Sequence, residues 1–263
     1  MVIIFDTERI KGENEAMKLN YVRFGEGPEK MVILPRISLK PVSTAPQAVI
    51  QAYDIFSKDF TVLLFDYRES PEEDLSISDM ADDVAEALKE LEIEDVFLYG
   101  VSMGGMVAQL LTIRYPELVK KLVLCSTVAK VDSDDLTSKW LEAAEQKDVF
   151  GLVNDFMKDV YSKEVYDENI DIAISMYKSL SDEELRDFTI RLKAANQFDV
   201  TSELHQISVP VLVLGSKADQ VFSLEQMQTI VNILNCESYF YEGYSHAVYD
   251  EAPDIKERIY DFY

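Results

Sequence analysis

The stretch from Val96 to Met106, VFLYGVSMGGM, decides the fold of this chain. Its first four residues are apolar, which is typical of a short strand buried on both faces. Ser102 then stands between Gly100 and Gly104 in the pattern G-x-S-x-G, and a helical pattern begins at Met106. Because glycine has no Cβ, a strand and a helix joined by so tight a turn can approach closely. The stretch therefore predicts a strand–turn–helix unit that presents the Ser102 hydroxyl beyond the end of a strand.

Similar short apolar runs recur on both sides of this unit, and segments with helical spacing separate them. Alternation of strands with helices predicts an α/β fold with a mostly parallel central sheet flanked by helices. The expected strands lie at 1–5, 19–24, 31–34, 61–65, 96–99, 122–125, 209–215 and 238–241. Ser78 is expected to cap the helix before the central strand.

The strand pattern disappears between residues 126 and 205, where apolar residues recur at helical spacing instead. We therefore expect one core made of residues 1–126 and 206–263, interrupted by a helical insertion at 127–205. The aromatic and methionine residues of the insertion either fill its own core or line an apolar pocket for an acyl group or ring. They are Trp140, Phe150, Phe156, Met157, Tyr161, Met176, Tyr177 and Phe188.

The composition excludes several classes of partner and site. Forty-nine acidic against 25 basic residues give a formal charge of −24, which disfavours nucleic acid and anionic membrane surfaces. The N-terminal residues lack the basic and apolar regions of a signal peptide, so we expect a cytoplasmic protein that interacts with no membrane. Two cysteines and two histidines without metal-ligand spacing argue against a zinc site, and we expect no metal or cofactor.

A serine hydroxyl needs a base to become a good nucleophile, and histidine suits that task near neutral pH. The chain has only His205 and His246. His246 follows the last expected strand, at the edge of the sheet where α/β sites form, whereas His205 precedes a strand. His246 is therefore the expected base, and His205 is expected at the surface or at a hinge.

The base in turn needs a carboxylate that orients it. Asp219 lies in the loop after the strand at 209–215, between the serine and the histidine in sequence. The order Ser102, Asp219, His246 matches that of an α/β-hydrolase triad. Asp250 and Asp254, both close to His246, remain alternatives, as does a turn role for Asp219.

Three segments together resemble the α/β-hydrolase superfamily: GVSMGGM at 100–106, GSKAD at 215–219 and GYSH at 243–246. Within it, the S-M-G-G-M form is similar to small intracellular esterases and enol-lactonases, and to related C–C bond hydrolases and thioester-type enzymes. The resemblance spans nearly the whole chain. It implies a cap, or lid, domain between the sixth and seventh strands of the sheet, where the insertion at 127–205 falls.

The chain departs from this superfamily after the strand at 31–34. The superfamily usually has His-Gly there, in a loop that donates one oxyanion N–H, and this chain has Pro35-Arg36-Ile37-Ser38. By position Ile37 should be that donor, and the backbone N–H of Met103 should be the other. Arg36 either faces solvent or binds an anionic group of the substrate.

These patterns predict a serine hydrolase that cleaves a carboxylic ester, thioester or lactone of a small molecule through an acyl-enzyme. Two alternatives stay open. The same triad can support C–C bond hydrolysis, a lyase reaction or perhydrolysis. The chain can also be a ligand-binding protein that keeps the fold with weak catalysis. The sequence leaves the oligomeric state open.

Overall fold

The computed structural model describes residues 6–11, 18–132 and 135–263. Within these residues, eight strands form one sheet in the order β1-β2-β4-β3-β5-β6-β7-β8. The strands are β1 (Asp6–Lys11), β2 (Lys18–Phe24), β3 (Glu29–Leu34), β4 (Phe60–Phe65), β5 (Val96–Val101), β6 (Val119–Cys125), β7 (Val211–Ser216) and β8 (Glu237–Tyr241). The pairs β1–β2 and β2–β4 are antiparallel. All other neighbours are parallel, so the predicted α/β class is confirmed.

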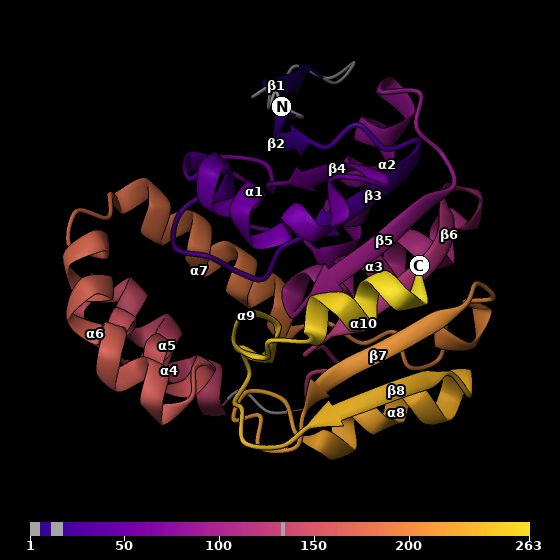
Figure 1. Cartoon of the computed structure of the whole chain (residues 1–263). Coiled ribbons are helices and arrows are strands. Elements are labelled where there is room, and N and C mark those ends of the chain that lie inside the picture. Colours follow the sequence, from indigo (N-terminus) through magenta and orange to yellow (C-terminus); the bar gives the residue numbers. More distant parts are fainter. Residues whose placement is uncertain (1–5, 12–17, 133–134) are drawn as a thin grey trace.

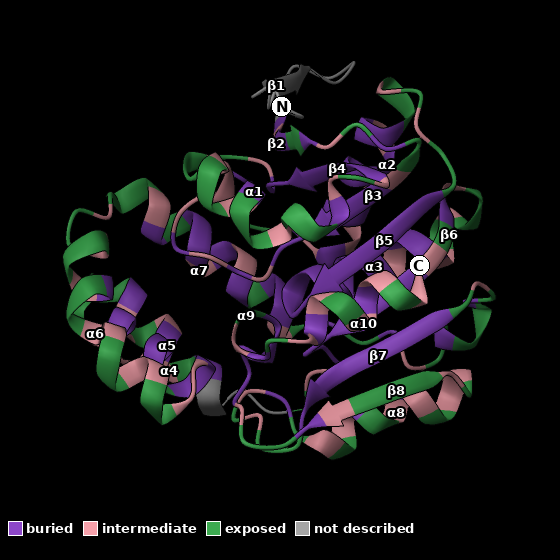
Figure 2. Cartoon of the chain, viewed as in Figure 1, coloured by how far each residue is buried: buried purple, intermediate pink, exposed green. Residues whose placement is uncertain are grey.

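The middle of the sheet is apolar because helices cover both of its faces. Every residue of β4, β5 and β7 is buried, whereas β8 at the edge is largely exposed (Figure 2). The expected strands from 19–24 onward appear within a few residues of their predicted bounds. The strand expected at 1–5 lies outside the described residues.

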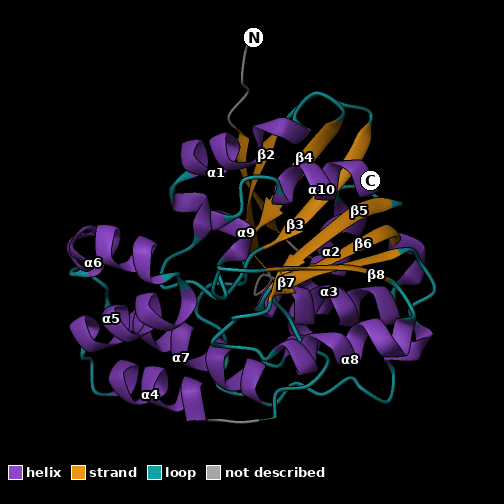
Figure 3. Cartoon of the chain, turned by 60° about the horizontal axis from the view of Figure 1, so that its bottom comes forward, coloured by secondary structure: helices purple, strands orange, loops and turns teal. Residues whose placement is uncertain are grey.

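The helices form two layers and a separate group. Figures 1 and 3 show α1 and α10 on one face of the sheet, and α2, α3 and α8 on the other. The described helices are α1 (Pro46–Tyr53), α2 (Ile77–Glu90), α3 (Met103–Arg114), α4 (Asp135–Glu145), α5 (Val149–Val160), α6 (Lys163–Tyr177), α7 (Asp182–Asn196), α8 (Leu224–Leu234), α9 (Val248–Glu251) and α10 (Ile255–Phe262). Among the described residues, none of these helices has the length and apolarity needed to cross a membrane.

The start of α2 differs from the expectation. Ser76, not Ser78, caps this helix, because the Ser76 hydroxyl accepts the backbone N–H of Asp79 while the Asp79 carboxylate accepts that of Ser76. This reciprocal pair satisfies two N–H groups of the first turn. Ser78 instead accepts a hydrogen bond from Arg114 of α3.

Helices α4 to α7 come between β6 and β7 in the sequence. In space they lie together beyond one end of the sheet (Figure 1). We call them the helical insert. Trp140, Phe156 and Phe188 are buried, and the Phe156 ring packs against the other two. Phe150 and Met176 are 63% and 56% exposed, so they do not belong to the core of the insert. The division into domains at 127 and 205 stays a prediction.

Candidate active site

Ser102 lies between the last residue of β5 and the first residue of α3. Its backbone has φ 52° and ψ −119°, a region that residues with a side chain rarely adopt. The turn persists because its neighbours pack closely: a Cβ at Gly104 would stand 2.1 Å from the Leu34 carbonyl oxygen. Thus β3 and α3 meet at Gly104, and the sharp turn directs the Ser102 hydroxyl away from the sheet.

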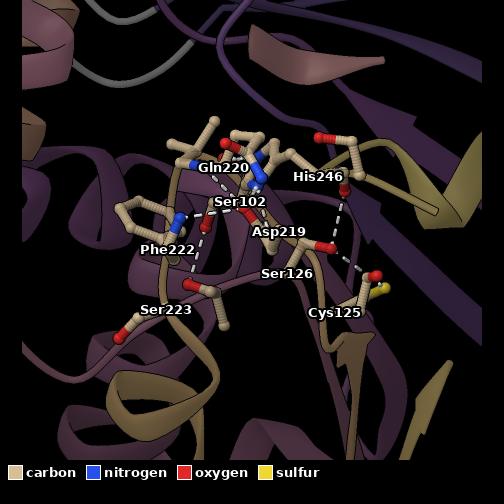
Figure 4. A network of polar contacts seen from close by, with 12 residues as sticks. Ser102, Cys125, Ser126, Asp219, Gln220, Phe222, Ser223 and His246 are labelled. Atoms are coloured by element: carbon tan, nitrogen blue, oxygen red, sulfur yellow. Dashed lines mark hydrogen bonds and ion pairs between the residues drawn. The ribbon is translucent and has the colours of Figure 1, made fainter. Parts of the chain in front are cut away.

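The structure brings His246 to Ser102. The loop between β8 and α9 places the His246 Nε2 atom 2.9 Å from the Ser102 Oγ atom, although 144 positions separate the two residues (Figure 4). Ser102 is 6% exposed and His246 is 2% exposed. The Ser102–His246 contact is therefore shielded from bulk water. An electrostatic interaction is stronger in such a buried position than in water.

Asp219 lies on the other side of the imidazole, in the loop after β7. Its Oδ2 atom is 2.9 Å from His246 Nδ1, and its side chain is fully buried. Its Oδ1 atom accepts the backbone N–H groups of Val221, at 2.7 Å, and Phe222, at 2.9 Å. These two bonds orient the carboxylate and stabilise its charge. A carboxylate only accepts, so Nδ1 of His246 carries the proton and Nε2 is free to accept from Ser102.

Contacts around the histidine hold it in position. The Ser126 Oγ atom donates to the His246 carbonyl oxygen at 2.8 Å, and Ser126 itself has φ 48°. The ring of Phe222 lies 5.4 Å from the imidazole and that of Tyr249 lies 6.0 Å away, both nearly perpendicular to it. No sequence motif singled out Ser126. Its role depends on β6 ending beside the loop after β8, which tertiary packing alone determines.

The two expected oxyanion donors lie on segments that meet beside Ser102. Met103 is the first residue of α3, where a backbone N–H has no acceptor within the helix. Ile37 follows the Leu34–Pro35 backbone that packs on Gly104, and the Tyr67 hydroxyl donates to the Pro35 carbonyl oxygen at 2.8 Å. The N–H of Met103 is thus available, while the role of Ile37 stays a prediction.

Arg36 does not extend into solvent, so that alternative is wrong. Its Nη2 atom donates to the Tyr161 hydroxyl at 3.1 Å, and its Nη1 atom donates to the Ile37 carbonyl oxygen at 3.1 Å. The guanidinium carbon lies 5.6 Å from the centre of the Phe156 ring. The side chain therefore points from the loop after β3 towards the helical insert, because an aromatic face and a hydroxyl of α5 and its C-cap receive it.

The other candidates from the sequence lie outside this cluster. His205 is exposed in the short helical turn Leu204–Gln206. Asp254 forms an ion pair with Arg258 on α10, with 2.9 Å between Oδ2 and Nε. Asp250 is exposed and accepts from the Tyr161 hydroxyl at 3.3 Å. Only Asp219 among the three candidate carboxylates contacts the His246 ring.

A groove of about 490 Å³ opens next to the candidate site. It lies between the segment from Lys158 to Asp167 of the helical insert and the loops that follow β7 and β8. Tyr161 and Ser245 belong to its wall, so the groove borders both the partner of Arg36 and the neighbour of His246.

Comparisons with known proteins support an α/β-hydrolase fold for this chain. The sequence model of the family described as serine aminopeptidase, S33, matches residues 51–253. The chain is 24% identical over 199 residues to 3-oxoadipate enol-lactonase 1 of Acinetobacter baylyi, and the match covers 74% of this chain and 75% of that protein. It is 25% identical over 281 residues to the proline iminopeptidase of Thermoplasma volcanium, covering 95% and 89%. The crystal structure of the enol-lactonase from Burkholderia xenovorans has a TM-score of 0.83 at 19% identity, covering 97% of this chain and 99% of that one.

Proposed function

Because the chain belongs to the α/β-hydrolases, in the family described as serine aminopeptidase S33, we propose that it is a serine hydrolase acting on a carboxylic ester, thioester or lactone. Ser102 is the nucleophile, His246 the general base and Asp219 the carboxylate that orients the base. The single observation that carries the proposal is the continuous hydrogen-bonded series from Ser102 Oγ through both nitrogens of His246 to Asp219.

The reaction follows from the proton positions in this series. His246 Nε2 accepts the Ser102 proton as Oγ attacks the substrate carbonyl carbon, and Asp219 stabilises the imidazolium that forms. The imidazolium then donates that proton to the oxygen or sulfur of the leaving group, which departs. The acyl group remains on Ser102 as an acyl-enzyme. Water, deprotonated by His246, cleaves the acyl-enzyme and restores the serine. No step of this series requires a metal ion or a cofactor.

The backbone N–H of Met103 would stabilise the negative charge that develops on the carbonyl oxygen. It lies at the amino end of α3, where the helix dipole also favours negative charge. Ile37 is the proposed second donor. Removing one such donor from an acyl-transfer enzyme typically lowers kcat about 100- to 1,000-fold.

Among acyl substrates we favour esters and lactones over the peptides that the family description suggests. Substrates of an aminopeptidase carry a free ammonium group, and the charged Arg36 beside the site would repel it. The substrate is expected to be a small molecule with an apolar acyl or ring portion.

Labelling with a fluorophosphonate tests the nucleophile, and a panel of esters, thioesters, lactones and amino-acid anilides tests the bond cleaved. We expect the wild-type protein to be labelled at Ser102 and Ser102→Ala to lose both labelling and ester turnover. Full turnover by Ser102→Ala would overturn the proposal. Turnover of a vinylogous diketone alone would favour C–C bond hydrolysis, and labelling with no turnover would favour a ligand-binding protein.

A further inference from the structure

Arg36 is a charged group without a direct counter-ion among the described residues. A guanidinium has five N–H groups, and only two of those on Arg36 have acceptors in the described part of the chain, the Ile37 carbonyl and the Tyr161 hydroxyl. None of the described carboxylates lies within 4.0 Å of it. Asp250 is reached only indirectly, because Tyr161 donates to it. Three N–H groups therefore remain for another partner.

The surroundings of Arg36 keep it charged although they bury it. Burial lowers the pKa of Arg36, but the neighbouring Tyr161, Tyr249 and Asp250 raise it by more, so the net shift is upward. The side chain is mostly shielded from solvent and rests on the Phe156 ring. A cation that is shielded from bulk water is costly unless it is paired, which makes an incoming anion the natural partner for its free N–H groups.

Arg36 also lies next to the reacting groups. The preceding Pro35 packs against Gly104, two residues after Ser102, so the backbone of Arg36 begins beside the nucleophile turn. Arg36 is close enough to Tyr249 for its charge to act on the pKa of the Tyr249 hydroxyl. The Tyr249 ring in turn lies 6.0 Å from the His246 ring. Tyr161, which accepts a hydrogen bond from Arg36, belongs to the wall of the groove beside the site, so an acyl chain directed from Ser102 towards the helical insert would approach the guanidinium.

We propose that Arg36 binds a carboxylate at the far end of the acyl group, so that the preferred substrates are monoesters or lactones whose acyl part carries a free carboxylate. This inference rests on the proposed function. A carboxylate fits because its two oxygens match the planar N–H groups of arginine, and its single charge matches the single cation. A chain of charge −24 repels anions, so such a substrate needs a local cation.

The test compares two esters that differ only in charge: the phenyl monoester of glutaric acid and the same ester with its free carboxylate converted to a primary amide. We expect Arg36→Gln to lower the ratio of kcat/KM for the acid ester over the amide ester roughly 10- to 100-fold, mainly through KM. Activity on the amide ester should change by less than about threefold.

Two control variants separate this role from simpler ones. Tyr161→Phe removes the hydrogen bond that links Arg36 to the helical insert but keeps the charge, so the preference for the acid ester should largely remain. If Tyr161→Phe abolishes the preference as fully as Arg36→Gln, Arg36 acts only as a structural link and the inference fails. Lys158→Gln removes one exposed positive charge from the wall of the groove and should leave the ratio unchanged. An equal loss there would mean that long-range attraction, not contact, sets the preference.

Failure of this inference can be told apart from failure of the proposed function. If the wild-type protein is labelled at Ser102 and hydrolyses both esters equally, with the same ratio in Arg36→Gln, the carboxylate site is refuted and the hydrolase stands. Calorimetry on Ser102→Ala tests binding without turnover. It should bind the acid ester about tenfold or more tightly than the amide ester, and Ser102→Ala with Arg36→Gln should lose that difference. Equal binding of the two esters would refute the site independently of catalysis.

Discussion

Replacing Asp219 by asparagine keeps the shape of the side chain and removes its charge. The Oδ1 atom accepts two backbone N–H groups, those of Val221 and Phe222. An amide nitrogen at that position would face two donors and leave both backbone groups unpaired, at about 1–3 kcal/mol each. The orientation that places the amide oxygen at the Oδ1 position is therefore favoured, and the amide nitrogen then faces His246 Nδ1. This orientation keeps the two hydrogen bonds from Val221 and Phe222, whereas the opposite one would keep only the single bond from His246.

The orientation of the amide determines the tautomer of the histidine. A donor opposite Nδ1 forces this nitrogen to accept, so the proton moves to Nε2, which faces Ser102 Oγ at 2.9 Å. An Nε2 that already carries a proton cannot accept one from the serine. We expect kcat/KM for an activated ester to fall about 1,000- to 10,000-fold, which corresponds to about 4–5.5 kcal/mol of lost transition-state stabilisation.

Steady-state ester hydrolysis and fluorophosphonate labelling measure this loss, with thermal unfolding as the check on the fold. The isosteric exchange should change Tm by no more than about 4 °C. Asp254→Asn is the matched control, since it makes the same exchange at a carboxylate that pairs with Arg258 and not with His246. The reasoning is refuted if Asp219→Asn keeps more than about a tenth of the activity, or if Asp254→Asn loses as much.

Three further predictions concern the backbone turn, a helix cap and a thiol. Gly104→Ala should lower Tm and reduce ester turnover about 100-fold or more, because its Cβ would stand 2.1 Å from the Leu34 carbonyl oxygen and displace the oxyanion loop; unchanged kinetics would contradict that close approach. Ser76→Ala should destabilise the protein by about 1 kcal/mol in denaturant unfolding and Ser78→Ala by less, since only Ser76 caps α2. Burial raises the pKa of the Cys236 thiol to about 11. Its alkylation at pH 8 should be roughly 100-fold slower than in the denatured chain and should rise about tenfold per pH unit, and a rate independent of pH would contradict the raised pKa.

The expectations that depended on a few adjacent residues agreed well with the structure. The turn at Ser102, the buried strand before it and the helix after it follow from apolar runs, glycine and helical spacing, which act over a short stretch of chain. The wrong prediction of Ser78 as the helix cap also concerns a short stretch of chain. Ser76 and Ser78 both lie near the start of the helix, and the return hydrogen bond between Ser76 and Asp79 selects Ser76. Local preferences bound such an element to within a few residues and do not resolve its first one.

The order of residues along the chain also predicted part of the candidate site. The sequence alone pointed to Ser102 and His246, because the chain has one serine in such a turn and two histidines. It also proposed Asp219 from its loop, but left Asp250 and Asp254 open among 49 acidic residues. Nothing in a linear pattern states which carboxylate contacts the imidazole.

What only the tertiary structure decided is which distant side chains meet. It brought Asp219 to His246 and turned Arg36 towards Tyr161, which lies 125 positions away in sequence. It also placed Ser126 beside the His246 loop. Periodicity and capping describe a segment and its nearest neighbours, whereas these contacts depend on how loops from distant parts of the chain pack at one edge of the sheet. The sequence by itself therefore determined the turn at Ser102 and the class of fold, and packing determined the charged surroundings in which that serine lies.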